Sequence, residues 1–242
     1  MANELSTAGV TVGYAFESSA GVRPEVGFQR VPGVKSTPDL NPEPASLEVT
    51  TLEDTDYKRF IPGIKAVDGA LPLLCNNTNE FQAAWHTLCT LANAKYADGL
   101  GTWFVVNVPR LDDSFFVNAI PSALGVTGMD VDAVAEVQAY ISPNDIAGWQ
   151  TAPTDPAVYI TPITTLKLTA LNSPLEITPV LDTVGAAIDT AVSSDTDVAT
   201  VSDDGEVITI TRVGAGECEI TITTTSGVGY SAGTTIIKII ST

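Results

Sequence analysis

The chain has 242 residues, 44% of them hydrophobic, which is enough for one large domain or two small ones with buried cores. Eleven Lys and Arg side chains against 29 Asp and Glu give a net charge of −18, which argues against a protein that grips the phosphates of a nucleic acid. The charge does not exclude a surface past which DNA slides without sticking, and the single histidine excludes any mechanism that needs two imidazoles.

The N-terminal sequence and the cysteines favour a protein made in a reducing cytoplasm. Residues 1–5 contain neither a basic region nor an apolar stretch, so they do not form a secretory signal. No run approaches the roughly 18 apolar residues that a membrane span needs. The three cysteines are sparse and odd in number, which is typical of core residues and not of a disulfide framework. We therefore expect no membrane span.

Prolines dominate the segment from Lys35 to Pro44 and exclude it from the centre of a sheet. Pro38, Pro42 and Pro44 each restrict their own backbone and that of the preceding residue. Long proline-bearing segments in compact domains are uncommon and often functional, although an ordinary surface loop would explain the pattern as well.

One helix is predicted from Thr78 to about Ala92. Asn77 is the expected N-cap, with Glu80 three residues further on, as in a capping box. Large and small apolar side chains then recur at helical spacing, namely Phe81, Ala84, Trp85, Leu88, Leu91 and Ala92. A stripe of this kind is typical of a helix packed on a sheet.

Strands follow the helix. The apolar runs 103–108 and 114–120 flank a turn-like sequence and predict a hairpin. Apolar residues alternate with mainly polar ones from Val131 to Ile141, which predicts a strand with one buried face. Asp130, Asp132 and Glu136 share the opposite face of that predicted strand.

The composition changes near residue 151. Residues 151–157 hold two prolines and no large apolar side chain, which predicts a linker between a domain of residues 1–150 and a domain of residues 158–242. In the second domain, alternation at Cys218, Ile220 and Ile222 and an Asp204-Gly205 turn between β-branched runs predict a small β-sandwich. A last strand is expected from 234 to 240.

Signals for catalysis are weak. His86 would have to serve any Ser-His-Asp triad, but no nucleophile motif lies near it. Cys75, His86 and Cys89 lack the paired spacing of a zinc site. The neighbouring carboxylates, such as Asp112 and Asp113, lie in turns of a very acidic chain. No phosphate-binding or calcium-binding motif occurs. We expect no enzyme activity, no cofactor and no metal.

Several motifs resemble one protein family. Residues 50–65, Thr-Thr-Leu-Glu-Asp-Thr-Asp-Tyr-Lys-Arg-Phe-Ile-Pro-Gly-Ile-Lys, resemble the central motif of major tail tube proteins of long, flexible-tailed (siphovirus-type) bacteriophages. The Asp-Gly-Ala-Leu of 68–71, the Asn-Thr-Asn-Glu-Phe of 77–81, the opening 5–10 and the closing 136–141 also look like this family. Residues 193–225, with Ser-Ser-Asp, Val-Ala-Thr-Val, Gly-Ala-Gly and a Thr-rich strand, resemble the bacterial Ig-like domain found on phage structural proteins.

The resemblance implies a mainly β protein, with an N-terminal β-sandwich or barrel carrying one packed helix and a C-terminal Ig-like β-sandwich. It implies hexameric rings of this chain that stack into a tube in the virion and conduct double-stranded DNA without specific binding. Tape measure, terminator and baseplate proteins would be neighbours, and the Ig-like domain would face outward toward host glycans.

The resemblance also suggests which residues face neighbours. The candidates for contact between rings are Pro38, Pro42, Pro44, Leu47, Thr51, Leu52, Asp54, Tyr57 and Phe60. The candidates for the lumen are Asp130, Asp132 and Glu136, whose face would otherwise meet outside solvent. The alternatives are a bacterial surface adhesin, another phage component such as a terminator or baseplate protein, and a cell-wall hydrolase.

Overall fold

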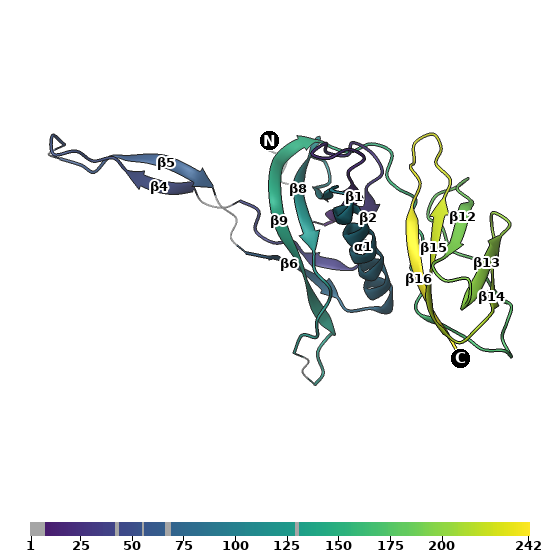
Figure 1. Cartoon of the computed structure of the whole chain (residues 1–242). Coiled ribbons are helices and arrows are strands. Elements are labelled where there is room, and N and C mark those ends of the chain that lie inside the picture. Colours follow the sequence, from purple (N-terminus) through teal and green to yellow (C-terminus); the bar gives the residue numbers. More distant parts are fainter. Residues whose placement is uncertain (1–7, 42–43, 55, 66–68, 129–130) are drawn as a thin grey trace.

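The computed structural model describes residues 8–41, 44–54, 56–65, 69–128 and 131–242, and it is mainly β with one helix, as predicted (Figure 1). The first part of the chain forms a curled antiparallel sheet of seven strands in the order β2-β1-β7-β8-β9-β6-β3. Its elements are β1 Thr11–Phe16, β2 Gln29–Arg30, β3 Val34–Ser36, β6 Leu71–Asn76, α1 Asn79–Ala97, β7 Thr102–Asn107, β8 Asp113–Pro121 and β9 Glu136–Thr151.

The N-cap of helix α1 lies one residue later than predicted, and the helix begins at Asn79. Thr78, not Asn77, is the N-cap, because Thr78 has extended backbone angles and its hydroxyl accepts a hydrogen bond from the Phe81 N–H at 3.1 Å. The Asn77 side chain accepts instead from the Gln82 amide at 2.7 Å. The helix continues to Ala97, beyond the predicted stripe, and Gly99 follows it with a φ of 75°.

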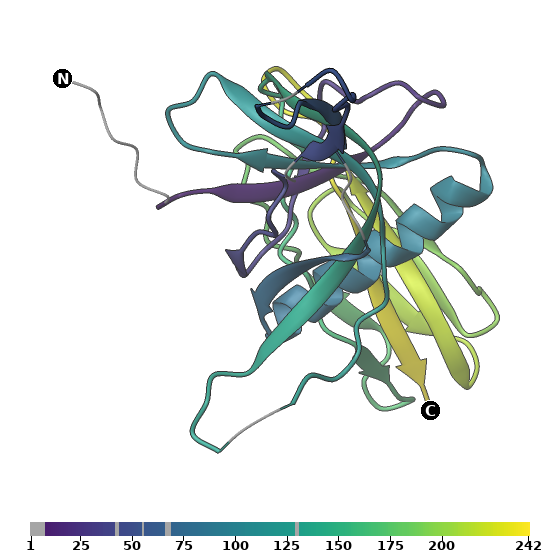
Figure 2. The ribbon, with the colours of Figure 1, turned by 90° about the vertical axis from the view of Figure 1, so that its left-hand side faces the viewer.

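The predicted stripe of α1 packs on the sheet. Phe81, Trp85 and Leu88 are fully buried against strand residues that include Phe104 and Val137. The Trp85 indole N–H donates to the Ser122 carbonyl at 2.8 Å, so the one polar atom of this side chain is satisfied. Figure 2 shows α1 lying behind the strands of the sheet.

Strand β9 differs from the prediction at its start. The strand begins at Glu136 and not at Val131, and both Val131 and Val134 are largely exposed. The reason lies in the pairing, because the neighbouring strand β6 reaches only as far as the pair of Asn76 with Glu136. Residues before Glu136 therefore have no strand beside them. The predicted hairpin of 103–108 and 114–120 is confirmed as β7 and β8.

The second part of the chain is a sandwich of two sheets. One sheet has the order β10-β16-β15-β12, and the other has the order β11-β14-β13. Isoleucines fill the space between the sheets, with Ile208, Ile210, Ile220, Ile222 and Ile237 fully buried. The bounds are β10 Leu166–Leu168, β11 Leu175–Ile177, β12 Ile188–Ser193, β13 Ala199–Asp203, β14 Ile208–Arg212, β15 Gly216–Thr224 and β16 Thr234–Ser241.

A separate two-stranded hairpin, β4 Pro44–Glu48 and β5 Phe60–Lys65, projects from the body on the side away from the second sandwich (Figure 1). Among the strands that the structure describes, it shares no ladder with the seven-stranded sheet or with the two sheets of the second sandwich. Among the described residues, no helix is long and apolar enough to cross a membrane.

Candidate assembly surface

The projecting hairpin presents apolar side chains that have little to pack on within the subunit. Leu47 and Ile61 are opposite each other in the register, and about half of each is exposed. Glu48 is opposite Phe60, which is 54% exposed. An isolated pair of strands is only marginally stable in water and usually needs a further surface to cover one face. This hairpin, called the arm below, therefore presents an apolar surface that the described residues of its own subunit leave largely exposed.

Polar contacts within the arm hold the shape of its turn. The Asp54 carboxylate accepts from the Thr51 N–H at 2.9 Å and lies 3.7 Å from the Arg59 guanidinium. Lys58 pairs with Glu48 at 3.0 Å. These partners satisfy the polar groups locally and leave Leu52 and Tyr57 pointing into solvent, at 105% and 87% exposure.

The structure brings most of the candidate contact residues together on the arm. Pro44 starts β4, Phe60 starts β5, and Leu47, Thr51, Leu52, Asp54 and Tyr57 lie between them. Pro38 is elsewhere, beside the body, and Pro42 lies outside the described residues.

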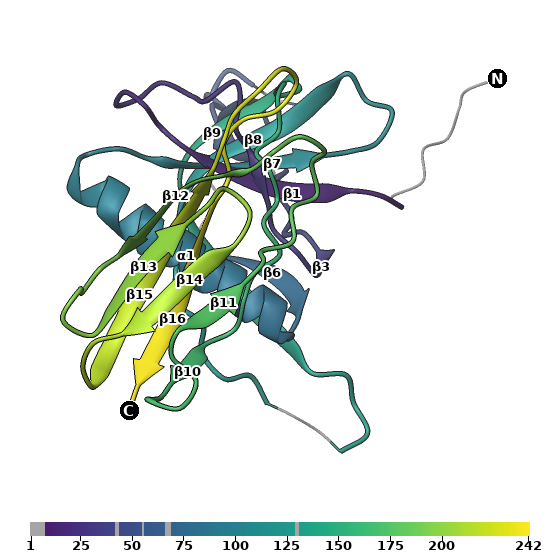
Figure 3. The same ribbon diagram turned by 90° about the vertical axis from the view of Figure 1, so that its right-hand side faces the viewer.

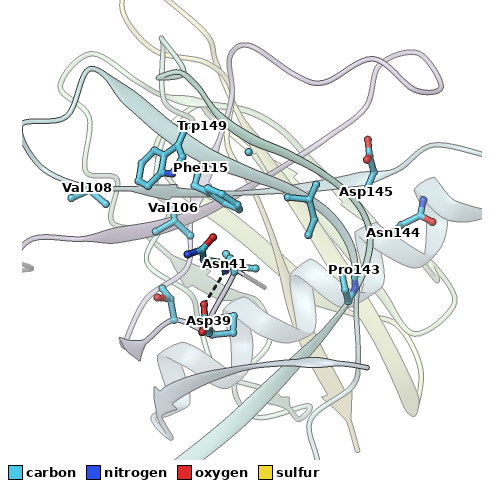
Figure 4. A pocket seen from close by; sticks show the side chains of 14 residues that line it. Asp39, Asn41, Val106, Val108, Phe115, Pro143, Asn144, Asp145 and Trp149 are labelled. Atoms are coloured by element: carbon cyan, nitrogen blue, oxygen red, sulfur yellow. Dashed lines mark hydrogen bonds between the residues drawn. The ribbon is translucent and has the colours of Figure 1, made fainter. Parts of the chain in front are cut away.

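Pro38 borders a groove of about 1010 Å³ on the body (Figure 4). Segment 37–41 forms one wall, and β7, β8 and β9 form the floor. The rings of Phe115 and Trp149 meet edge to face on that floor with centroids 5.6 Å apart, and Trp149 is 53% exposed. Sequence reasoning missed this apolar surface. The adjacent Phe115 and Phe116 could have predicted it. Neighbouring residues of a strand face opposite sides of the sheet, so both phenylalanines cannot enter one core.

The lumen candidates do not form one described strand face. Asp130 lies outside the described residues, and Asp132 occupies a turn with a φ of 61°. Glu136 is on β9, on the face opposite the buried Val137, and forms an ion pair with Lys35 of β3. The nearby Gln138 continues that polar face.

Three residues considered for catalysis or metal binding, His86, Cys75 and Cys89, have these surroundings in the structure. His86 is half exposed and contacts the Glu219 carboxylate at 2.8 Å. Burial raises the pKa of the Cys75 thiol to about 12 and that of the Cys89 thiol to about 11, so neither is a thiolate near neutral pH. Within the described residues, no three His, Cys, Asp or Glu side chains are placed to hold a metal ion.

A buried carboxylate with no sequence signal organises one end of the sheet. Glu17, only 4% exposed, accepts hydrogen bonds from the N–H groups of Gly21 and Gly101 and from the Trp103 indole, each at 2.9 Å. The Asn118 amide adds a fourth at 3.3 Å. A Cβ on Gly101 would lie 2.4 Å from that amide nitrogen, so a larger residue there would push the Asn118 side chain away from Glu17. Glu17 thus joins three separate segments, namely the loop at Gly21, residues 101–103 and Asn118 of β8.

Comparison with protein-family models finds no matching family, and comparison with curated proteins finds no match either.

Proposed function

We propose that this chain is a structural subunit of a phage tail tube, in which hexameric rings stack and the acidic inner wall conducts DNA toward the host. The observation that carries the proposal is the projecting hairpin. Its residues 50–65 are the stretch that resembles the central motif of tail tube proteins, and its apolar side chains are largely exposed in the subunit.

The edge of β9 also supports assembly into rings. The last ten residues of β9 pair with β8 on one side, whereas β6 accompanies only residues 136–141 on the other. A long unpaired edge is a template for a strand from another molecule. A heterologous contact of this kind, repeated around an axis, closes into a ring.

The charge supports the conduit. A net charge of −18 on every subunit repels phosphate, so DNA would pass without adhering. In this arrangement Glu136, and the segment around Asp132, are the candidates for the inner wall. The second sandwich, at the end of the subunit opposite the arm, would be displayed outside for weak attachment to cell-surface glycans (Figure 1).

The test is negative-stain microscopy of the concentrated protein. We expect tubes of uniform width from the wild type. We expect isolated subunits from a Leu47→Ser, Ile61→Ser double variant, with unchanged circular dichroism and melting temperature, because both residues lie outside the two cores.

Val192→Ser is the matched control, since Val192 is 59% exposed on β12 and far from the arm in the chain. It should form tubes like the wild type. Equal tube formation by the arm variant would reject the role of the arm, and a wild-type chain that forms no ordered assembly would reject the function.

A further inference from the structure

Helix α1 has a second buried face, turned away from the core of its own domain. Thr87 is 1% exposed although it is polar and does not belong to the stripe formed by Phe81, Trp85 and Leu88. Its hydroxyl accepts a hydrogen bond from the backbone N–H of Ile236, on β16 of the second sandwich, at 3.1 Å. Strand β10 accompanies β16 only at residues 239–241, so it supplies no acceptor at Ile236.

The burial of Ile236 shows how closely the two domains meet. Ile237 and Ile239 belong to the core of the sandwich, so Ile236, which precedes Ile237 on the same strand, is on the outer face. Val192, Thr221 and Ile236 lie side by side across β12, β15 and β16 on that face. Val192 is 59% exposed, whereas Ile236 is 3% exposed. Ile236 is the end of the row that contacts α1, through the Thr87 hydroxyl. Figure 3 shows α1 behind the sheet that contains β15 and β16.

Polar contacts surround this apolar junction. His86 of α1 meets Glu219 of β15, and the Tyr159 hydroxyl donates to the Glu80 carboxylate near the start of α1. On another side, the Gln29 amide donates to the Thr234 carbonyl at 2.8 Å. Exposed contacts of this kind add little energy each, but together they define one relative orientation.

The segment between the domains is held on both sides. On the side of the first domain, the Thr154 N–H donates to the Glu25 carbonyl at 3.1 Å, and the Asp155 carbonyl accepts from the Gly27 N–H at 3.0 Å. On the side of the second domain, the Pro156 carbonyl accepts a hydrogen bond from the Ser231 N–H at 3.0 Å. The composition of residues 151–157 predicts a linker, yet its backbone groups are engaged like those of a strand.

We propose that the second sandwich is locked onto α1 as a fixed part of the subunit, with Thr87 and Ile236 at the centre of the lock. The lock is a property of the single chain and does not depend on the proposed assembly. Where rings do form, it would place every outer domain in one defined orientation. A domain on a free tether would instead sample many.

The first measurement uses the full-length chain and proteinase K, with mass spectrometry to locate cuts within residues 151–157. When opening and closing are fast relative to cleavage, the cutting rate reports the population in which the segment is released. Thr87→Val leaves the Ile236 N–H without its acceptor. We expect cleavage to accelerate about tenfold, which corresponds to about 1.4 kcal/mol. Thr90→Val, the same change one turn along α1, should alter the rate less than about twofold, a shift below about 0.5 kcal/mol.

The second measurement is ¹⁵N relaxation of the full-length chain. We expect both domains of the wild type to share one rotational correlation time. Ile236→Lys places a charge under α1 and should give two correlation times while the sandwich keeps its own dispersed spectrum. Val192→Lys, on the same face and in the same row, should keep one.

The proposal is overturned if the wild-type domains already tumble separately. It is also overturned if Thr87→Val and Thr90→Val are cut at the same rate, or if Ile236→Lys and Val192→Lys tumble alike. Loss of the dispersed spectrum in Ile236→Lys would leave the decision to the Thr87→Val comparison, which introduces no charge and no cavity.

Discussion

Replacing Glu17 by Gln should destabilise the first domain strongly, although it changes one atom and keeps the shape of the side chain. Each carboxylate oxygen accepts two of the four hydrogen bonds: one oxygen faces Trp103 and Asn118, and the other faces Gly21 and Gly101. An amide nitrogen in place of either oxygen would point its hydrogens at two donors.

The magnitude follows from those two lost contacts. Hydrogen bonds to a charged group contribute about 1.5–3 kcal/mol each, and buried donors left without an acceptor add a desolvation cost. We expect the free energy of unfolding to fall by about 3–6 kcal/mol, a large share of the 5–15 kcal/mol typical of a domain.

The same contacts make the stabilisation depend on pH. Burial alone would raise the pKa of Glu17, but hydrogen bonds from Gly101, Trp103 and Gly21 outweigh burial and hold the pKa below its ordinary value of 4.5. A carboxyl with a lower pKa in the folded state stabilises the fold fully above its unfolded pKa and loses this contribution as pH falls through the folded pKa. Stability should therefore drop below about pH 4.5 in the wild type, and less steeply in Glu17→Gln.

Urea unfolding followed by tryptophan fluorescence measures the effect, because all three tryptophans lie before residue 150 and report on the first domain. Glu25→Gln is the control, since Glu25 is exposed and the same charge is lost. The control should stay within about 0.5 kcal/mol of the wild type. A Glu17→Gln protein as stable as the control at neutral pH would refute the reasoning.

Two other predictions concern the helix and the inner wall. Trp85→Ala should cost about 3–5 kcal/mol of unfolding free energy in urea, because it empties a fully buried site and removes the indole N–H that donates to the Ser122 carbonyl. Stability near wild type would contradict this packing. Asp132→Asn with Glu136→Lys should leave tails intact but slow DNA release from virions, because a less acidic wall repels phosphate less. The effect should be seen at low salt, since mobile ions screen the wall beyond about 10 Å at ordinary salt. Normal release at low salt would exclude this segment from the wall.

Local patterns predicted much of the fold. The apolar stripe of α1 is confirmed because helical spacing alone determines which side chains share a face. The alternation of Cys218, Ile220 and Ile222 is confirmed in the core of the second sandwich for the same reason. The predicted start of β9 was wrong. The alternation in the sequence begins at Val131, but β6, the partner strand that sustains the ladder, reaches only as far as Glu136.

The sequence could not predict contacts between distant segments. Thr87 and Ile236 are 149 positions apart, and a threonine beside an apolar stripe resembles an ordinary surface residue. Glu17 was hidden for a different reason. Two of its donors are backbone N–H groups, which every sequence contains, so nothing distinguishes it from the other acidic residues of the chain.

Charge explains why the arm is suited to contact between copies of so acidic a chain. Bodies that each carry a large negative charge repel one another at short range, where salt screens them poorly. Residues 44–65 hold three basic and four acidic side chains, so the arm has a net charge of −1 and leaves −17 to the rest of the chain. Within the arm, Lys58 and Arg59 are already paired with Glu48 and Asp54. A contact made through the arm therefore brings apolar side chains to a neighbour with almost no added like charge, whereas two acidic bodies meeting directly would have to overcome their repulsion first.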